Sequence, residues 1–319
     1  MHLTYTVLEN GLDFIRFALD NVADTEQATD DATKKRLLKY ALLHLSSGIE
    51  LVLKYRLFQE HWTYVFSDMN TAKRAALESG DFKSADSETI IKRLSSLCDI
   101  EIDEKNISDL KQLRNKRNKI EHFEFKEPLR SVEISIHKCI TIITEFIAKH
   151  YSISTFSEDE KMLFHEIKQQ LRAMDKHFDD LRAIAQKELD EIGVTDAITC
   201  PECWETFLVP GDGELAHCHF CEYESTGEQV ALEYTRSVMG IDEYAINDGE
   251  NDPICDCPEC GQPSLVFDYN QDMAVCFNCG TQYESRNMEY CSSCGTLFVD
   301  DDEGIGICDN CFEYKMSKD

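Results

Sequence analysis

The sequence predicts a multidomain protein in which an all-α helical bundle precedes a helical connector and three small β-rich units. Apolar side chains recur at helical spacing over residues 1–151. Residues 1–150 hold 22 basic and 24 acidic side chains, whereas residues 199–319 hold 4 and 26. Thirteen of the 15 cysteines lie at or after Cys200. These two compositions indicate at least two domains, joined by a connecting helix over residues 152–198.

The overall composition excludes several classes of protein. The chain of 319 residues is 42% hydrophobic and 10% aromatic, which excludes a disordered chain. No run approaches the roughly 18 apolar residues of a membrane-spanning helix, and the first residues lack the pattern of a secretory signal. We therefore expect a cytoplasmic protein with no membrane partner. The net charge of −29 argues against a protein that coats nucleic acid in general.

Five amphipathic helices are expected in the first domain, because apolar residues are spaced three and four apart in each. Gly80-Asp81 and Glu127-Pro128 interrupt the pattern. Gly48 lies inside the second helix, where it costs about 1 kcal/mol relative to alanine, so we expect a close helix contact there. The expected helices cover residues 3–23, 31–66, 87–97, 106–122 and 132–151.

A run of basic residues lies near the end of the fourth expected helix. Four bases fall within the six residues from Arg114 to Lys119, in a domain that is otherwise near neutral. One interpretation is a solvated helix face, with His122 favoured by the negative end of the helix dipole. The other is a phosphate-handling site, since arginine offers a planar fork to phosphate oxygens and histidine transfers protons near neutral pH.

The spacing of Arg117 and His122 limits how the two side chains can act together. They are five residues apart, so on an ideal helix they point about 140° apart. They can meet only if the helix ends near Ile120, or if two chains bring two copies of the motif together.

The segment Arg117-Asn118-Lys119-Ile120-Glu121-His122 resembles the signature of HEPN domains. That signature is an arginine, a polar residue, and then a histidine after four to six intervening residues. The segment from His44 to Lys54 is also similar to the second helix of bacterial HEPN-like proteins. The resemblance covers about residues 1–150.

The resemblance implies a metal-independent ribonuclease that works as a homodimer, with each chain contributing one motif to a shared cleft. In such enzymes a ribose 2′-OH attacks the adjacent phosphate and leaves a 2′,3′-cyclic end. His122 would then be the acid or base, Arg117 would stabilise the charged transition state, and Asn118 would orient the reacting groups. Some family members bind nucleotides or RNA without cutting, and such domains commonly belong to bacterial defence or toxin systems. Ancillary contacts to RNA phosphates would come from Arg114, Lys116 and Lys119.

The connecting helix begins with a capping-box signal, Ser157 followed by Glu160. One interpretation of its apolar stripe is a dimer seam, because the spacing alternates between three and four as in a coiled coil. The other is that the stripe docks onto the helical bundle of its own chain. The stripe consists of Phe164, Ile167, Leu171, Met174, Phe178, Leu181 and Ala185.

Twelve cysteines after residue 199 form a threefold repeat, each repeat made of two C-x2-C pairs. Two residues between cysteines let one turn aim both sulfur atoms at a single metal ion, so each repeat predicts a four-cysteine site. Hairpins are expected between the pairs, over residues 206–217, 264–275 and 296–307. The expected ligands are Cys200, Cys203, Cys218 and Cys221; Cys257, Cys260, Cys276 and Cys279; and Cys291, Cys294, Cys308 and Cys311.

Each repeat resembles a zinc ribbon, and Cys257-Pro258-Glu259-Cys260-Gly261 is close to the knuckle of that family. Units this small do not fold on apolar burial alone, so a metal must supply folding free energy. Four thiolates favour a structural Zn²⁺ in each, with rubredoxin-like iron as the alternative. Cys255 is left over, as a spare thiol or an alternative ligand to Cys257. The expected ribbons cover residues 199–230, 254–285 and 286–319, with a linker over 231–253.

The acidity of the ribbons opposes the nucleic-acid binding that zinc ribbons often perform. Four bases in the 121 residues from 199 to 319 do not neutralise a phosphate backbone. We expect the ribbons either to dock a basic protein partner or to cover the basic patch from Arg114 to Lys119 and compete with RNA. The activity that the resemblance implies for the whole chain is that of an endoribonuclease. The alternative is a non-catalytic adaptor that binds RNA, nucleotide or protein and recruits partners through the ribbons.

Overall fold

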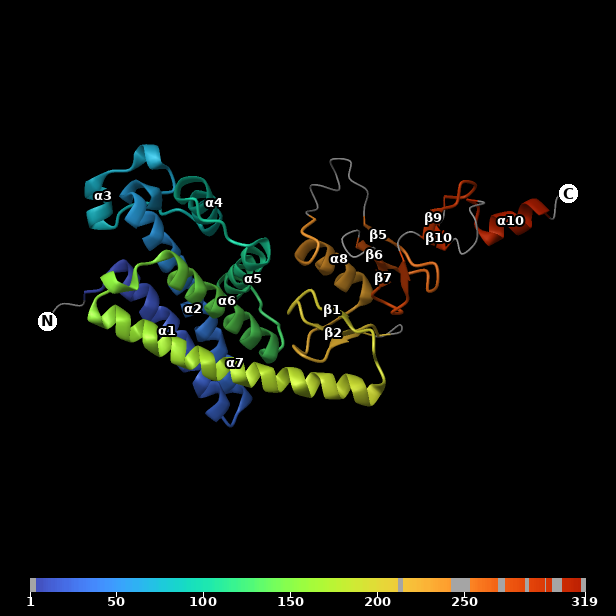
Figure 1. Ribbon diagram of the computed structural model, residues 1–319, viewed down its shortest axis with the longest axis horizontal. Helices are drawn as coiled ribbons and strands as arrows, with labels where there is room; N and C mark the ends of the chain where they lie inside the picture. The colour runs from blue at the N-terminus through green and yellow to red at the C-terminus, as the bar shows by residue number, and fades with distance from the viewer. Residues whose placement is uncertain are drawn as a thin grey trace. The chain divides into compact units, whose positions relative to one another are not determined.

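The protein consists of a helical unit followed by a β-rich unit, as the computed structural model in Figure 1 shows. The structure describes residues 4–211, 215–241, 253–268, 273–284, 287–295, 297–299 and 306–316. The chain divides into two compact units, Met1–Asp180 and Leu181–Asp319. The helices of the first unit and the three four-cysteine clusters of the second confirm the predicted fold class. None of the helices in the described ranges is long and apolar enough to cross a membrane.

Two long helices, α1 (Val7–Gln27) and α2 (Asp31–Glu60), lie side by side in the first unit (Figure 1). The first helix begins four residues later than the sequence pattern indicates, because Thr6 and Glu9 form a capping box that fixes its start. Asp30 caps the second helix by accepting a hydrogen bond from the first turn. The caps thus define a helical hairpin that supplies much of the apolar core.

The two helices approach most closely at Gly48. A Cβ atom added to Gly48 would lie 2.7 Å from Ile15 Cγ1 and 2.8 Å from the carbonyl oxygen of Gly11. A Cβ atom added to Gly11 would in turn lie 3.1 Å from Val52 Cγ2 of α2. The close helix contact expected at Gly48 is therefore confirmed.

Four further helices complete the bundle sequence before residue 151: α3 (Arg74–Ser79), α4 (Ser87–Cys98), α5 (Glu104–His122) and α6 (Leu129–His150). The short α3 was not predicted, because its six residues carry little periodicity. The second helix was expected to reach Phe66, but it ends at Glu60. His61 is extended there and starts a 3-10 turn over Trp62–Val65.

The connecting helix, α7 (Glu158–Ile192), docks its first half onto the bundle (Figure 1). Ser157 and Glu160 form the expected capping box, with Glu160 N donating to Ser157 Oγ at 3.1 Å. Thr6 Oγ1 also donates to Glu160 at 2.8 Å, which ties the starts of α1 and α7 together. Apolar residues in the first half of the stripe belong to the bundle core, so this part of it is occupied within the chain: Phe164, Ile167, Leu171 and Met174.

The first sheet of the second unit has four short antiparallel strands in the order β1-β2-β3-β4. They are β1 (Ile198–Thr199), β2 (Thr206–Val209), β3 (Ala216–Cys218) and β4 (Glu224–Ser225). The helix α8 (Gly227–Ser237) follows, so the segment expected as a linker from residue 231 is helical as far as Ser237. The helix α8 was not predicted, because its residues were divided between the first expected ribbon, which ended at residue 230, and the linker. Residues 242–252 of that linker lie outside the described residues.

The second sheet repeats this pattern in the order β5-β6-β7-β8, again antiparallel. Its strands are β5 (Ile254–Asp256), β6 (Pro263–Asp268), β7 (Met273–Cys276) and β8 (Gln282–Glu284). The expected hairpin is therefore confirmed, and Tyr269 at its tip lies outside the described residues.

The first two sheets are packed together through α8. A Cβ atom on Gly227, the first residue of α8, would lie 2.7 Å from Asn278 Cα. The start of α8 therefore touches the backbone of the turn in the second cysteine repeat. The Tyr234 hydroxyl donates to Asp268 Oδ2 at 3.0 Å, and its ring lies 5.0 Å from that of Phe277. The two cysteine repeats thus share one packed body.

The third repeat departs from its expected hairpin. The strand β10 (Leu297–Val299) pairs with the preceding β9 (Met288–Tyr290), whereas a pairing with residues 305–307 was expected. Gly306 and Ile307 are not in a strand, and Ile305 lies outside the described residues. The chain then forms an unpredicted helix, α10 (Asp309–Met316), which contains Cys311.

The Gly48 contact predicts the effect of adding one methyl group. Replacing Gly48 with alanine gains about 1 kcal/mol of helix propensity but overpacks a contact that costs about 1–3 kcal/mol. We expect Gly48→Ala to lower the free energy of unfolding by up to about 2 kcal/mol, measured by denaturant titration. Ser47→Ala, on the same turn, is the matched control and should leave stability nearly unchanged. A more stable Gly48→Ala protein would show that the helices separate at no cost.

Candidate functional site

The predicted catalytic residues lie on the last two turns of α5. Asp103 caps this helix, and the Phe123 amide donates to the Lys119 carbonyl at 2.8 Å, so the helix continues through His122. An end near Ile120 would have brought Arg117 and His122 together, and the structure does not have one. The backbone positions of the two residues therefore lie on different faces of the helix.

Glu121 lies between the side chains of the two predicted catalytic residues. Its Oε2 atom is 2.8 Å from Arg117 Nη1 and 3.9 Å from His122 Nε2. Arg117 Nη1 also donates to Asn118 Oδ1 at 3.0 Å. The His122 side chain is 74% exposed and that of Arg117 is 36% exposed. Glu121 was not predicted as a site residue. Its spacing of four residues from Arg117 is the signal that could have predicted this ion pair.

The predicted RNA-contacting residues have different environments. Lys116 is only 4% exposed, and its ammonium lies 3.4 Å from Glu127. Lys119 lies 3.6 Å from the same carboxylate but is largely exposed. Arg114 pairs with Glu88 on α4 at 2.6 Å. Lys119 is thus the most accessible of the three to an external phosphate.

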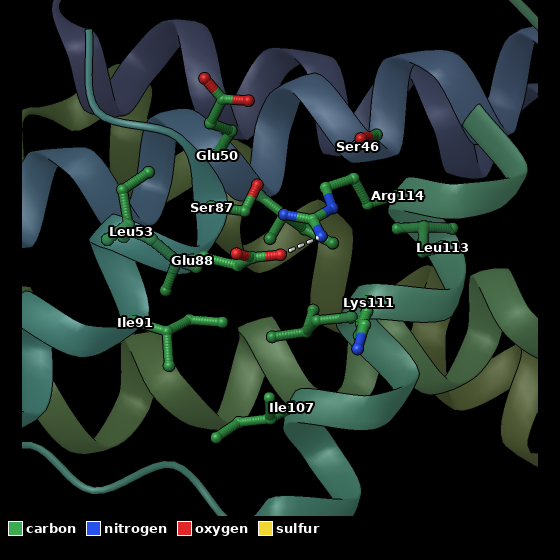
Figure 2. A pocket seen from close by; sticks show the side chains of 13 residues that line it. Ser46, Glu50, Leu53, Ser87, Glu88, Ile91, Ile107, Lys111, Leu113 and Arg114 are labelled. Carbon is green, nitrogen blue, oxygen red and sulfur yellow. Dashed lines mark hydrogen bonds and ion pairs between the residues drawn. The ribbon is translucent and has the colours of Figure 1, made fainter. Parts of the chain in front are cut away.

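Arg114 and Glu88 lie at a small cavity between α2, α4 and α5. Figure 2 shows the Arg114 guanidinium directed at Glu88, with Leu53 and Ile107 among the apolar residues that line the cavity. The cavity holds only about 70 Å³. Sites for small molecules are typically about 300–1,000 Å³, so this one is too small for a nucleotide.

All twelve predicted cysteine ligands are brought together in three groups of four. In each group every sulfur lies within 4.8 Å of the others. The Sγ atoms of Cys200 and Cys221 are 3.7 Å apart, as are those of Cys260 and Cys276. A tetrahedral ion with metal–sulfur bonds of about 2.3 Å requires sulfur atoms about 3.8 Å apart. The spacing and the donor set therefore fit a metal ion in each group.

The surroundings of the second cluster support thiolate ligands. Burial raises the pKa of the Cys276 thiol to about 12, opposed by hydrogen bonds such as the one from Ser264 Oγ, 3.3 Å away. Asn278 Nδ2 donates to Cys260 Sγ at 3.6 Å. A thiol that resists ionisation on its own loses its proton readily to a bound cation, so metal binding releases protons and weakens in acid.

The remaining candidates near the clusters are not placed as ligands. The Cys255 sulfur lies 3.2 Å from the Tyr290 hydroxyl and is outside the group that contains Cys257. His217 and His219 face carboxylates, those of Glu224 and Glu188. The three groups of the described structure therefore use sulfur alone.

The clusters predict a metal count with an internal control. Cys276→Ala removes one ligand from the second group, so the purified protein should hold two metal ions per chain where the wild type holds three. Thermal unfolding of the second unit should begin at a lower temperature. Cys255→Ala removes a nearby thiol outside the groups and should keep three ions, measured by elemental analysis. Equal metal loss in both variants would contradict the assignment.

No family model, curated protein or solved structure matches this chain. The three groups of four cysteines in small sheets are consistent with zinc ribbons. They are preceded by a helical bundle in which the last turns of α5 carry a basic run.

Proposed function

We propose that the protein is a metal-independent endoribonuclease of the HEPN type. The observation that carries the proposal is that Arg117 and His122, on exposed turns at the end of α5, both approach the carboxylate of Glu121. The all-α bundle around them agrees in class with the fold that the resemblance implies. A role in bacterial defence or toxicity is the context that such domains commonly have.

The chemistry assigned to this site is cleavage by the substrate's own 2′-OH. A base removes the 2′-OH proton, the oxygen attacks the adjacent phosphorus, and the 5′-oxygen leaves with a proton supplied by an acid. His122 fills the acid or base role, and Arg117 stabilises the added negative charge on the phosphate. Asn118 orients the Arg117 guanidinium, to which it is hydrogen-bonded. The products are a 2′,3′-cyclic phosphate and a 5′-hydroxyl.

The resemblance makes two chains part of the proposal. The backbone positions of Arg117 and His122 lie on different faces of an unbroken helix, although both side chains of one chain reach the carboxylate of Glu121. In a homodimer, Arg117 of one chain and His122 of the other form a complete set. Glu121 holds Arg117 in the absence of RNA, and a phosphate must compete with that carboxylate to bind.

A second candidate function is a non-catalytic adaptor that binds RNA, nucleotide or protein. The Arg117–Glu121 ion pair favours it, because the pair already compensates the charge that catalysis would use. Under this proposal the basic turns of α5 bind their partner without changing it, and the ribbons recruit a further protein.

For the second unit, we propose structural Zn²⁺ in all three clusters. Four sulfur ligands fill a tetrahedral shell and leave no position for a reacting group, so the ion would supply folding free energy and no catalysis. The unit's surface is strongly acidic, since residues 199–319 hold 26 acids against 4 bases. We assign it the docking of a basic protein or competition with RNA for the basic turns of α5.

The ribonuclease proposal predicts the effect of two alanine variants. His122→Ala and Arg117→Ala should each lower the rate of RNA cleavage by at least about 100-fold, since each removes a group that acts in the transition state. The assay uses total RNA and tRNA in buffer with EDTA, with metal content checked to show that the clusters stay loaded. Products are analysed for 2′,3′-cyclic ends.

The control variant is Lys92→Gln, an exposed residue of α4 away from these turns, which should cleave at the wild-type rate. Mixing the His122→Ala and Arg117→Ala proteins should restore part of the activity if the site is shared between chains. Cleavage that survives in both variants would place the activity elsewhere, and no cleavage by the wild type would favour the adaptor.

The metal proposal predicts zinc as the element. Elemental analysis of the protein should give three zinc ions per chain and no iron, and the protein should be colourless. Thiolate-bound ferric iron absorbs visible light. A red protein with one or more iron atoms per chain would therefore show that the clusters bind iron and would contradict the zinc assignment.

A further inference from the structure

The three cysteine clusters differ in how far protein atoms cover their sulfur ligands. The first cluster is fully covered, because each of its cysteines is at most 1% exposed. The second has two buried and two half-buried cysteines. In the third, Cys291 is buried and Cys294 is exposed, and the other two cysteines are half-buried. Access of a solute to the ligands therefore increases from the first cluster to the third.

The structure that supports each cluster decreases in the same order. The first two repeats have four-stranded sheets, which α8 joins into one packed body through Gly227 and Tyr234. The third repeat has the two strands β9 and β10, and its last ligand, Cys311, lies on α10. This helix has eight residues, fewer than the about 12–15 that an isolated helix needs to persist in water. The position of α10 therefore depends on the bond from Cys311 to a metal ion.

Hydrogen bonds protect the half-buried sulfur atoms of the second cluster. Asn278 Nδ2 donates to Cys260 Sγ at 3.6 Å. The Thr281 hydroxyl lies 3.2 Å from Cys279 Sγ. A hydrogen bond withdraws charge from a thiolate and fixes its orientation as a ligand. The exposed Cys294 is thus the most accessible of the twelve ligands to an oxidant.

We propose that the third cluster is the site at which peroxides oxidise this protein, through a disulfide between Cys294 and Cys308 that displaces the metal ion. The two sulfur atoms lie 3.6 Å apart. A disulfide bond is about 2.05 Å long, so it forms after a small movement of the two side chains. Exposed thiolates oxidise first, which makes Cys294 the sulfur that peroxide attacks. The inference goes beyond the proposed function, and rests on it only for zinc as the metal.

The reaction balances with a peroxide as the oxidant. The Cys294 thiolate attacks one oxygen of hydrogen peroxide, the O–O bond breaks, and hydroxide leaves a sulfenic acid on Cys294. The Cys308 thiolate then attacks that sulfur, the S–O bond breaks, and a second hydroxide leaves. Two protons from the solvent convert the hydroxides into water. Peroxide gains two electrons and each sulfur loses one. Cys291 and Cys311 remain, and two thiolates do not hold an ion that needs four ligands.

The wild-type protein provides the first test. Full-length protein loaded with three zinc ions is treated with hydrogen peroxide beside a colorimetric zinc chelator. We expect a fast phase that releases one ion per chain and a slow phase for the other two. Thiols are then blocked with N-ethylmaleimide at the end of the fast phase. Peptide mass spectrometry should find the disulfide between Cys294 and Cys308 and reduced cysteines in the first two clusters.

The same treatment should loosen one helix and leave the paired repeats folded. Hydrogen exchange should increase over residues 309–316, the range of α10, because oxidation removes the metal that holds Cys311. It should stay unchanged over residues 206–209 and 263–268, the ranges of β2 and β6. This measurement reports on the fold and does not depend on any activity of the protein.

Matched variants separate the third cluster from its neighbours. Cys294→Ser removes the third site, so the protein should start with two ions and show the slow phase alone. Cys203→Ser, at the equivalent position of the first cluster, should also start with two ions but keep the fast release of one. Cys255→Ala removes the thiol outside the clusters and should leave both phases unchanged.

The inference is overturned if all three ions leave in one phase, or if cysteines of the first or second cluster oxidise before Cys294 and Cys308. A fast phase that survives in Cys294→Ser would also overturn it. Its failure is distinguishable from that of the zinc proposal, because elemental analysis before the treatment identifies the bound metal. Iron in the clusters would remove the zinc assignment, and the peptide map would still report which cluster oxidises first.

Discussion

The mutual repulsion of four cysteine thiolates is the constraint on which the second unit depends. Each cluster holds its sulfur atoms about as close as a single tetrahedral ion requires, and burial opposes ionisation of a thiol such as Cys276. Without a cation these groups would have to separate or stay protonated. The short strands of this unit, two to six residues long, bury too little apolar surface to hold them together. A metal ion bound at each cluster would therefore supply part of the folding free energy of this unit.

The helical unit rests on a different balance, in which apolar packing sets the frame and charge pairs decide what is free to act. Gly48 lets α1 and α2 touch, and the first half of α7 closes the same core. On the outer turns of α5, Glu121 and Glu127 engage basic residues of the motif.

Most of this organisation could be predicted from the sequence because its signals are periodic. Helical spacing located five helices, and the repeated C-x2-C pairs located all twelve sulfur atoms of the clusters. Short elements were missed where periodicity has no room to develop, as in α3, α8 and α10. The predicted pairing of β10 with residues 305–307 was wrong, because several short segments of the third repeat have similar sequences of strand-forming residues and β9 is the one that pairs with it.

The basic motif shows the limit of sequence reasoning at a site. Spacing alone gave the angle between Arg117 and His122, and the continuous α5 agrees with it. Spacing did not predict that Lys116 is buried. It also did not predict a cavity of about 480 Å³ that α2 and the loop after α5 form together, with Lys35 and Lys39 in its lining. Such features depend on contacts between residues about 80 positions apart. No local pattern in one segment reports on the other.

The contact between Gly227 and Asn278 has a consequence for how the cysteine repeats can be exchanged. Each repeat carries its own four cysteines, which by itself would let the repeats be replaced one at a time. Here the first residue of α8 admits no side chain against the turn that carries Cys276 and Cys279. A recombination that replaced one of the two repeats would have to supply a glycine and a matching turn at the same time. The first two repeats can therefore be exchanged only together.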